Sequence, residues 1–74
     1  QADDINYIFE KKGEGYLADE LLQVAKIRLT ALELSLSDIG KMLEPPISRS
    51  GVNHRLKKIS LIADTLRGEE NRGE

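Results

Sequence analysis

The sequence predicts an all-α fold, a small domain of four helices without a sheet. Apolar residues recur three and four positions apart in four separate segments, as they do on one face of a helix. Glycines lie between the first two segments and prolines between the last two, where they end helices and begin loops. A chain of 74 residues is long enough for one domain with a small core. The four helices are expected near residues 3–12, 17–30, 36–43 and 49–67.

The first helix carries Ile5, Ile8 and Phe9 on one side, and Gly13 should end it. Two roles are open for this helix. It is either one more core helix or the connector from a domain further upstream. Because the chain begins at Gln1 rather than at Met, we expect it to be part of a longer protein.

The second helix is apolar over much of its circumference. The helix either forms the centre of the core or exposes a patch to a partner, because its apolar residues are more than one narrow stripe needs. They are Leu17, Leu22, Ile27, Leu29, Leu32 and Leu34. In so small a domain the core role is favoured. Residues 31–34 are expected to form a loop.

The third and fourth helices meet at a corner. Ser35, followed by Asp38, predicts a capped start for the third helix, and Pro45 stops it after Leu43. Ser48 or Ser50 can cap the fourth helix. Gly40 leaves room where the two helices cross closely. This arrangement predicts a helix-turn-helix motif.

The outer face of the fourth helix, opposite Val52, Leu56 and Ile59, is rich in hydrogen-bond donors. Arginine suits guanine and asparagine suits adenine, while lysine contacts phosphates. A solvated polar face is the simpler interpretation, but the preceding capped helix and turn favour DNA binding. The candidate DNA-binding residues are Ser48, Arg49, Ser50, Asn53, His54, Arg55, Lys57 and Lys58.

The distribution of charge supports this interpretation, although the net charge is −2. Residues 1–40 carry four basic and eight acidic side chains, and residues 61–74 carry two basic and four acidic ones. Residues 41–60 carry five basic and one acidic side chain, a local charge of +4. The positive charge therefore coincides with the proposed helix-turn-helix.

The stretch SLSDIGKMLEPPISRSGVNHRLKKI, residues 35–59, resembles the C-terminal helix-turn-helix domain of the WhiA family of sporulation and cell-division transcription regulators. The matching residues are Leu36, Gly40, Leu43, Pro45, Pro46, Ile47, Ser48 and the run from Ser50 to Leu56. The resemblance extends weakly from Leu17 to Leu66. Ala18 stands where the family has proline, and Ala31-Leu32 stand where it has Asn-Pro.

The resemblance implies a sequence-specific DNA-binding domain of a bacterial regulator of sporulation, cell division and the cell cycle. It also implies a LAGLIDADG-like domain upstream in the same chain, and a place at the nucleoid in the cytoplasm. Double-stranded DNA is the expected partner. We expect the domain organisation to be residues 1–16 for the first helix and its linker, 17–67 for the helix-turn-helix domain and 68–74 for a disordered tail without apolar residues.

Enzyme chemistry is not indicated. The chain has no cysteine, a single histidine, no HExxH motif and no phosphate-binding glycine loop, so we expect no catalytic site, metal or cofactor. No apolar run approaches the roughly 20 residues that a membrane span needs. The alternative function is a protein-interaction module that docks on another domain or on a transcription protein through the leucine-rich helix 17–30.

Overall fold

The computed structural model describes residues 2–72, and most of them are helical. The elements are α1 (Ala2–Lys12), a 3₁₀ turn η1 (Glu14–Tyr16), α2 (Asp19–Thr30), α3 (Leu36–Met42) and α4 (Arg49–Arg72). No strand occurs within residues 2–72. The prediction of an all-α domain with four helices is confirmed.

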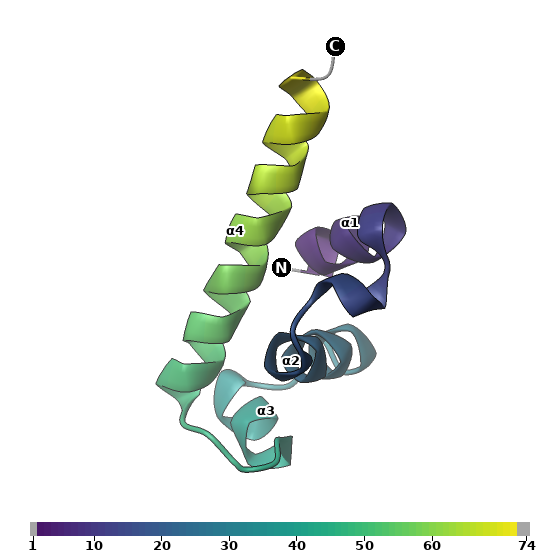
Figure 1. Cartoon of the computed structure of the whole chain (residues 1–74). Helices are drawn as coiled ribbons and strands as arrows, with labels where there is room; N and C mark the ends of the chain where they lie inside the picture. Colours follow the sequence, from purple (N-terminus) through teal and green to yellow (C-terminus); the bar gives the residue numbers. More distant parts are fainter. Residues whose placement is uncertain (1, 73–74) are drawn as a thin grey trace.

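The longest helix, α4, organises the arrangement of the others. With 24 residues it is about 36 Å long at 1.5 Å per residue. Helices α1, α2 and α3 all contact α4 and lie along one side of it (Figure 1). Of these, α1 lies beside the C-terminal half of α4, and α3 lies beside its N-terminal end. The opposite side of α4 is therefore left uncovered by the other three helices.

The side chains between α4 and the other helices form a single hydrophobic core. Along α4 the buried residues are Val52, Leu56, Ile59, Ala63 and Leu66. The other elements contribute Ile5, Ile8, Leu17, Leu21, Val24, Ala25, Ile39 and Leu43 to the same cluster. Because Ile5 and Ile8 are fully buried in it, α1 is a core helix, one of the two roles left open. Residues on both sides of position 16 contribute to this core.

The leucine-rich second helix also contributes to this core. Leu17 and Leu21 are buried, and Leu22, Ile27, Leu29 and Leu34 are partly buried against the cluster. Leu32, which follows the end of α2, is exposed instead. The favoured core role is therefore confirmed. The predicted start of the helix at Leu17 is wrong, because Leu17 and Ala18 are extended and α2 begins at Asp19. The cause is η1, whose last hydrogen bond runs from the Leu17 N–H to the Glu14 carbonyl.

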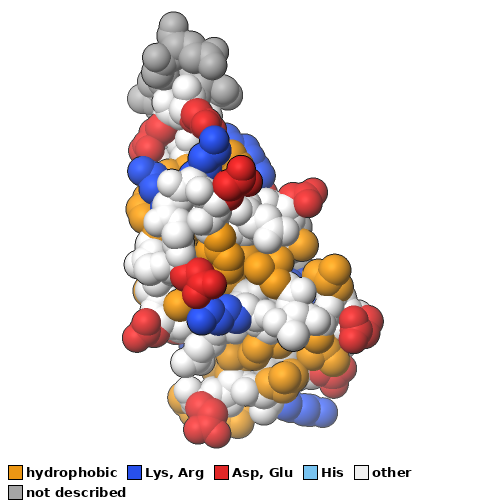
Figure 2. All heavy atoms as spheres, turned by 90° about the vertical axis from the view of Figure 1, so that its right-hand side faces the viewer, with side chains coloured by type: hydrophobic (Ala, Val, Ile, Leu, Met, Phe, Trp, Pro, Cys, Tyr) orange, Lys and Arg blue, Asp and Glu red, His pale blue; other side chains and the backbone are white. Residues whose placement is uncertain are grey.

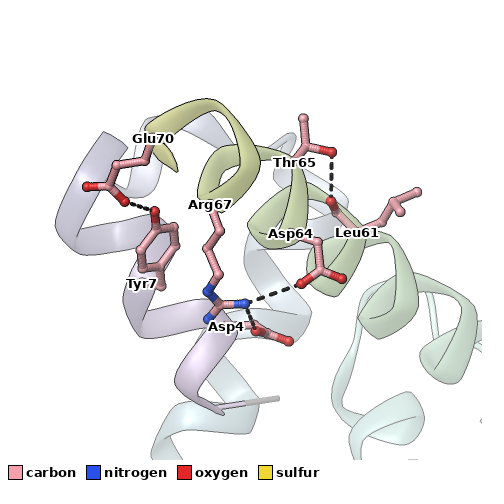
Figure 3. Close-up of polar contacts among 7 residues, drawn as sticks. All are labelled: Asp4, Tyr7, Leu61, Asp64, Thr65, Arg67 and Glu70. Carbon is pink, nitrogen blue, oxygen red and sulfur yellow. Dashed lines mark hydrogen bonds and ion pairs between the residues drawn. The ribbon is translucent and has the colours of Figure 1, made fainter. Parts of the chain in front are cut away.

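The predicted end of the last helix near Arg67 is also wrong, since α4 continues to Arg72. Residues 68–72, expected to belong to a disordered tail, are helical, while residues 73 and 74 lie outside the described part of the chain. The physical reason is a set of polar contacts with α1, which we call the α1–α4 clasp (Figure 3). Its members are Asp4, Tyr7, Lys11, Arg67 and Glu70.

In the clasp, Arg67 Nη1 lies 2.7 Å from Asp4 Oδ1, and its guanidinium stacks 4.7 Å from the centre of the Tyr7 ring. The Tyr7 hydroxyl donates a hydrogen bond to Glu70, and Lys11 Nζ lies 3.0 Å from the same carboxylate. Glu70 is thus held by two side chains of α1. These contacts stabilise the helix over residues 68–72, which include no apolar residue.

Candidate nucleic-acid interface

The interface begins with α3, a helix of seven residues with a well-defined cap at its start. The Ser35 hydroxyl accepts a hydrogen bond from the Asp38 N–H at 3.1 Å, as the sequence predicts. At the other end, Leu43 is extended and follows the last helical residue, Met42. The Glu44–Pro45 peptide bond is cis. The prolines therefore follow the end of α3, where the sequence places the corner.

Gly40 allows the close backbone contact that closes the turn. The Ile47 N–H donates a hydrogen bond to the Gly40 carbonyl at 3.1 Å, which brings the two backbones into direct contact. A Cβ atom at position 40 would overlap the carbonyl oxygen of Ile47 and would lie 3.3 Å from Cγ2 of Val52. The close approach predicted at Gly40 is confirmed. Its nearest neighbour is the turn residue Ile47 rather than the second helix itself.

The second helix of the motif is capped by Ser48. Its hydroxyl accepts a hydrogen bond from the Gly51 N–H at 3.2 Å, which decides between the two serines that the sequence left open. Buried Val52 and Leu56 then fix the rotation of α4 against α3. The first turns of α4 are therefore rigidly oriented by a cap at one end and a packed face along one side.

The outward face of these turns presents the predicted residues. Ser50, His54 and Lys57 lie close to the side opposite the core, and Asn53 and Lys58 lie at its two edges. All of the predicted residues are exposed except Asn53 and Arg55, which are partly buried. Within residues 2–72, no carboxylate forms an ion pair with Arg49, Lys57 or Lys58. These three cations are available to a ligand.

Arg55 has a different environment from the other basic residues of α4. Only 24% of its side chain is exposed, and its Nη2 lies 3.5 Å from Oε2 of Glu20 in the first turn of α2. The guanidinium is therefore held against α2 rather than presented with Lys57 and Lys58. The sequence gives no signal for this contact, because the two residues are far apart in the chain and neither belongs to a recognisable motif.

A second contact that the sequence does not indicate orders the loop before α3. Arg28 Nη1 donates hydrogen bonds to the carbonyl oxygens of Leu32 and Leu34, at 3.4 and 3.2 Å. These bonds place the chain directly before the cap at Ser35. In the sequence, Arg28 falls within the apolar pattern of the second helix, which conceals its role.

Two kinds of feature are absent from residues 2–72. No helix there is both long and apolar enough to cross a membrane. No group of three or more histidine, cysteine, aspartate or glutamate side chains in this part of the chain is arranged to hold a metal ion.

The capped helix, the tight turn and the oriented second helix define a helix-turn-helix domain. Comparison with known families identifies it further: residues 1–63 match the family described as the WhiA C-terminal HTH domain. The chain belongs to this family, and the resemblance noted in the sequence is confirmed.

Individual relatives agree with this assignment. The chain is 44% identical over 73 residues to a protein of Moorella thermoacetica, a match that covers 99% of the chain and 23% of the relative. It is 49% identical over 69 residues to a protein of Clostridium acetobutylicum, covering 93% of the chain and 22% of the relative. Both relatives are named "Probable cell division protein WhiA". The chain spans less than a quarter of their length. No solved structure matches it.

Proposed function

We propose that this domain binds double-stranded DNA sequence-specifically, with the first turns of α4 in the major groove. The observation that carries the proposal is the outward face of α4, where hydrogen-bond donors lie on one oriented surface together with Lys57 and Lys58. Neither lysine has an ion-pair partner within residues 2–72, and nor does Arg49 at the start of the helix. The major groove is about 12 Å wide and admits one α-helix. The side of α4 opposite the core is not covered by α1, α2 or α3, so a duplex can approach it (Figure 1).

The proposed contacts divide into two kinds. Ser50, Asn53 and His54 lie on the first turns and would face base edges, whereas Lys57 and Lys58 would contact phosphates. Ser48 and Arg49 lie where α4 begins, at the edge of the major groove, and Arg49 would contact a third phosphate. Arg55 is left out of this set because it is paired with Glu20.

In the whole protein, we propose that this domain is the DNA-reading part of a regulator of cell division and sporulation. The names of the relatives and their greater length support a role within a larger chain. An upstream LAGLIDADG-like domain and action at the bacterial nucleoid belong to the same proposal. The proposed role is regulatory rather than enzymatic.

A titration at several salt concentrations tests DNA binding. Three phosphate contacts, by Arg49, Lys57 and Lys58, give a slope of about −3 in log affinity against log salt, since each contact contributes about −0.9. Chemical shifts of the labelled domain should change mainly within residues 35–60 when duplex is added. A flat salt dependence, or shifts confined to residues 17–34, would contradict the proposal.

One observation favours a second function, docking on another domain or on a transcription protein. Ile27 of α2 and Met42 of α3 line a shallow hollow, and Met42 remains 57% exposed. Figure 2 shows hydrophobic side chains exposed between charged ones on the face that α1, α2 and α3 form. Most leucines of α2 lie in or against the core, however, so little of that helix is left for a partner. The same NMR titration, with a candidate partner in place of DNA, tests this function.

A further inference from the structure

The contact between Glu20 and Arg55 lies at the edge of the proposed DNA interface and has no role in the proposal above. Arg55 is in the same stretch of α4 as Lys57 and Lys58, yet its guanidinium points toward the first turn of α2. Glu20 is 67% exposed there, so its carboxylate is in water and not part of the core. A phosphate that came near Arg55 would meet this carboxylate first or at the same time.

The geometry of the pair indicates that Glu20 competes with a DNA phosphate for Arg55 and does not prepare Arg55 to bind one. The contact between Arg55 Nη2 and Glu20 Oε2 is 3.5 Å long, beyond the distance of a good hydrogen bond. If Glu20 oriented Arg55 for DNA binding, the remaining donors of the guanidinium would face the duplex. Instead, three quarters of the Arg55 side chain is covered. The Glu20 carboxylate itself is exposed and the contact is long, so a phosphate could take its place beside Arg55 once the charge of Glu20 is removed.

We propose that Glu20 withholds Arg55 from DNA and thereby lowers the affinity of the domain for every duplex. This inference rests on the proposed function. Glu20 supplies no sequence information, because it acts on a phosphate contact and phosphates are the same at every site. Its effect is to keep one of the four cations between Arg49 and Lys58 out of the sequence-independent part of binding.

The variant Glu20→Gln tests the inference, because it removes the charge and keeps the size of the side chain. With a short random-sequence duplex, the slope of log affinity against log salt should become more negative by about 0.9, one additional phosphate contact. At 0.1 M salt the affinity should rise about eightfold, since one released counterion changes the affinity with salt concentration to the power of about −0.9.

Two further variants separate this effect from a general loss of negative charge. Asp19→Asn removes a charge from the same first turn of α2 without touching the ion pair, so it should leave the slope unchanged. In an Arg55→Ala background, Glu20→Gln should no longer change the slope. Circular dichroism should show that Glu20→Gln and Asp19→Asn remain folded, since both side chains are exposed, and it also checks that the Arg55→Ala background is folded.

Each outcome has a definite meaning. If Glu20→Gln binds the random duplex no better than the original chain, or more weakly, the inference is overturned. It is also overturned if the gain persists without Arg55 or appears equally in Asp19→Asn. If the proposed function itself is wrong, the original chain will show no salt-dependent binding to DNA and no chemical-shift changes within residues 35–60.

Discussion

At the scale of single residues, Gly40 is the position where the fold tolerates least. A side chain here must enter the space of the Ile47 carbonyl, a backbone atom that cannot rotate away. Gly40→Leu should therefore lower the free energy of unfolding by about 1–3 kcal/mol, the usual cost of overpacking. Chemical denaturation measures this change. Gly15→Leu is the matched control, because a Cβ there meets no atom within 4 Å; equal losses in both variants would show that the turn is not the cause.

Asn53 is the residue proposed to read a base. It follows buried Val52 and lies partly exposed at the edge of the outward face, on the first turns of α4. A bidentate pair between an asparagine amide and adenine discriminates by about 1–3 kcal/mol. Asn53→Ala should leave the melting temperature nearly unchanged but weaken binding to a selected site far more than to random duplex. Equal losses on both duplexes would remove Asn53 from the base-reading set.

Lys57 is proposed to contact phosphate, and its substitution should have a different signature. Lys57→Ala should weaken binding to all duplexes about equally and make the salt slope shallower by about 0.9. Lys26→Ala serves as the control, since Lys26 is a similarly exposed lysine on α2 that pairs with Glu14. A change of sequence preference with an unchanged slope would contradict the division between positioning and reading residues.

At the scale of elements, local chemistry predicts the helix-turn-helix well and the ends of the longer helices poorly. Ser35, Gly40 and Pro45 act on neighbours a few residues away, so their effects can be read directly from the sequence. The end of α4 depends instead on Tyr7 and Lys11, about 60 positions away, which hold Glu70. Propensity and apolar spacing contain no information about such pairs.

The candidate site, too, contains a contact between distant residues that the sequence does not predict. Apolar spacing along α4 predicts which side faces the core, and hence that Ser50, His54 and Lys57 face outward. It does not predict that Arg55 pairs with Glu20, because that depends on how α2 crosses α4. Long side chains at the edge of a helix face are therefore the ones whose roles need the structure.

At the scale of the whole molecule, α4 connects two regions with different roles. Its first turns form the proposed DNA interface, and its last turns are held to α1 by the clasp (Figure 3). Because a continuous helix runs between them, the direction in which α1 leaves the domain is fixed relative to the outward face of α4. Any domain joined through α1 would therefore meet DNA in a defined orientation.

The clasp should also determine how the domain responds to acid. Partial burial opposes ionisation of Asp4, but hydrogen bonds from Arg67 and Ser60, together with the positive charge of Arg67, hold the pKa of Asp4 below its ordinary value of 3.8. Hydrogen bonds from Tyr7 and Lys11 likewise lower the pKa of Glu70 below 4.5. Both carboxyls bind protons more weakly in the folded state than in the unfolded chain. Their contribution to stability is therefore complete above the ordinary values and is lost as the pH falls through the lowered ones.

Asp4→Asn tests this dependence, because it removes the charge and keeps the shape of the side chain. The variant should melt a few degrees below the original chain at pH 7, and the difference should shrink as the pH falls below about 4, where the original Asp4 becomes protonated as well. Asp3→Asn is the matched control, since Asp3 is exposed in the same first turn of α1 and takes no part in the clasp. Melting curves measured between pH 7 and pH 3 test this dependence on pH. A difference that stays constant over this range would mean that the ionised carboxylate of Asp4 does not stabilise the contact between α1 and α4.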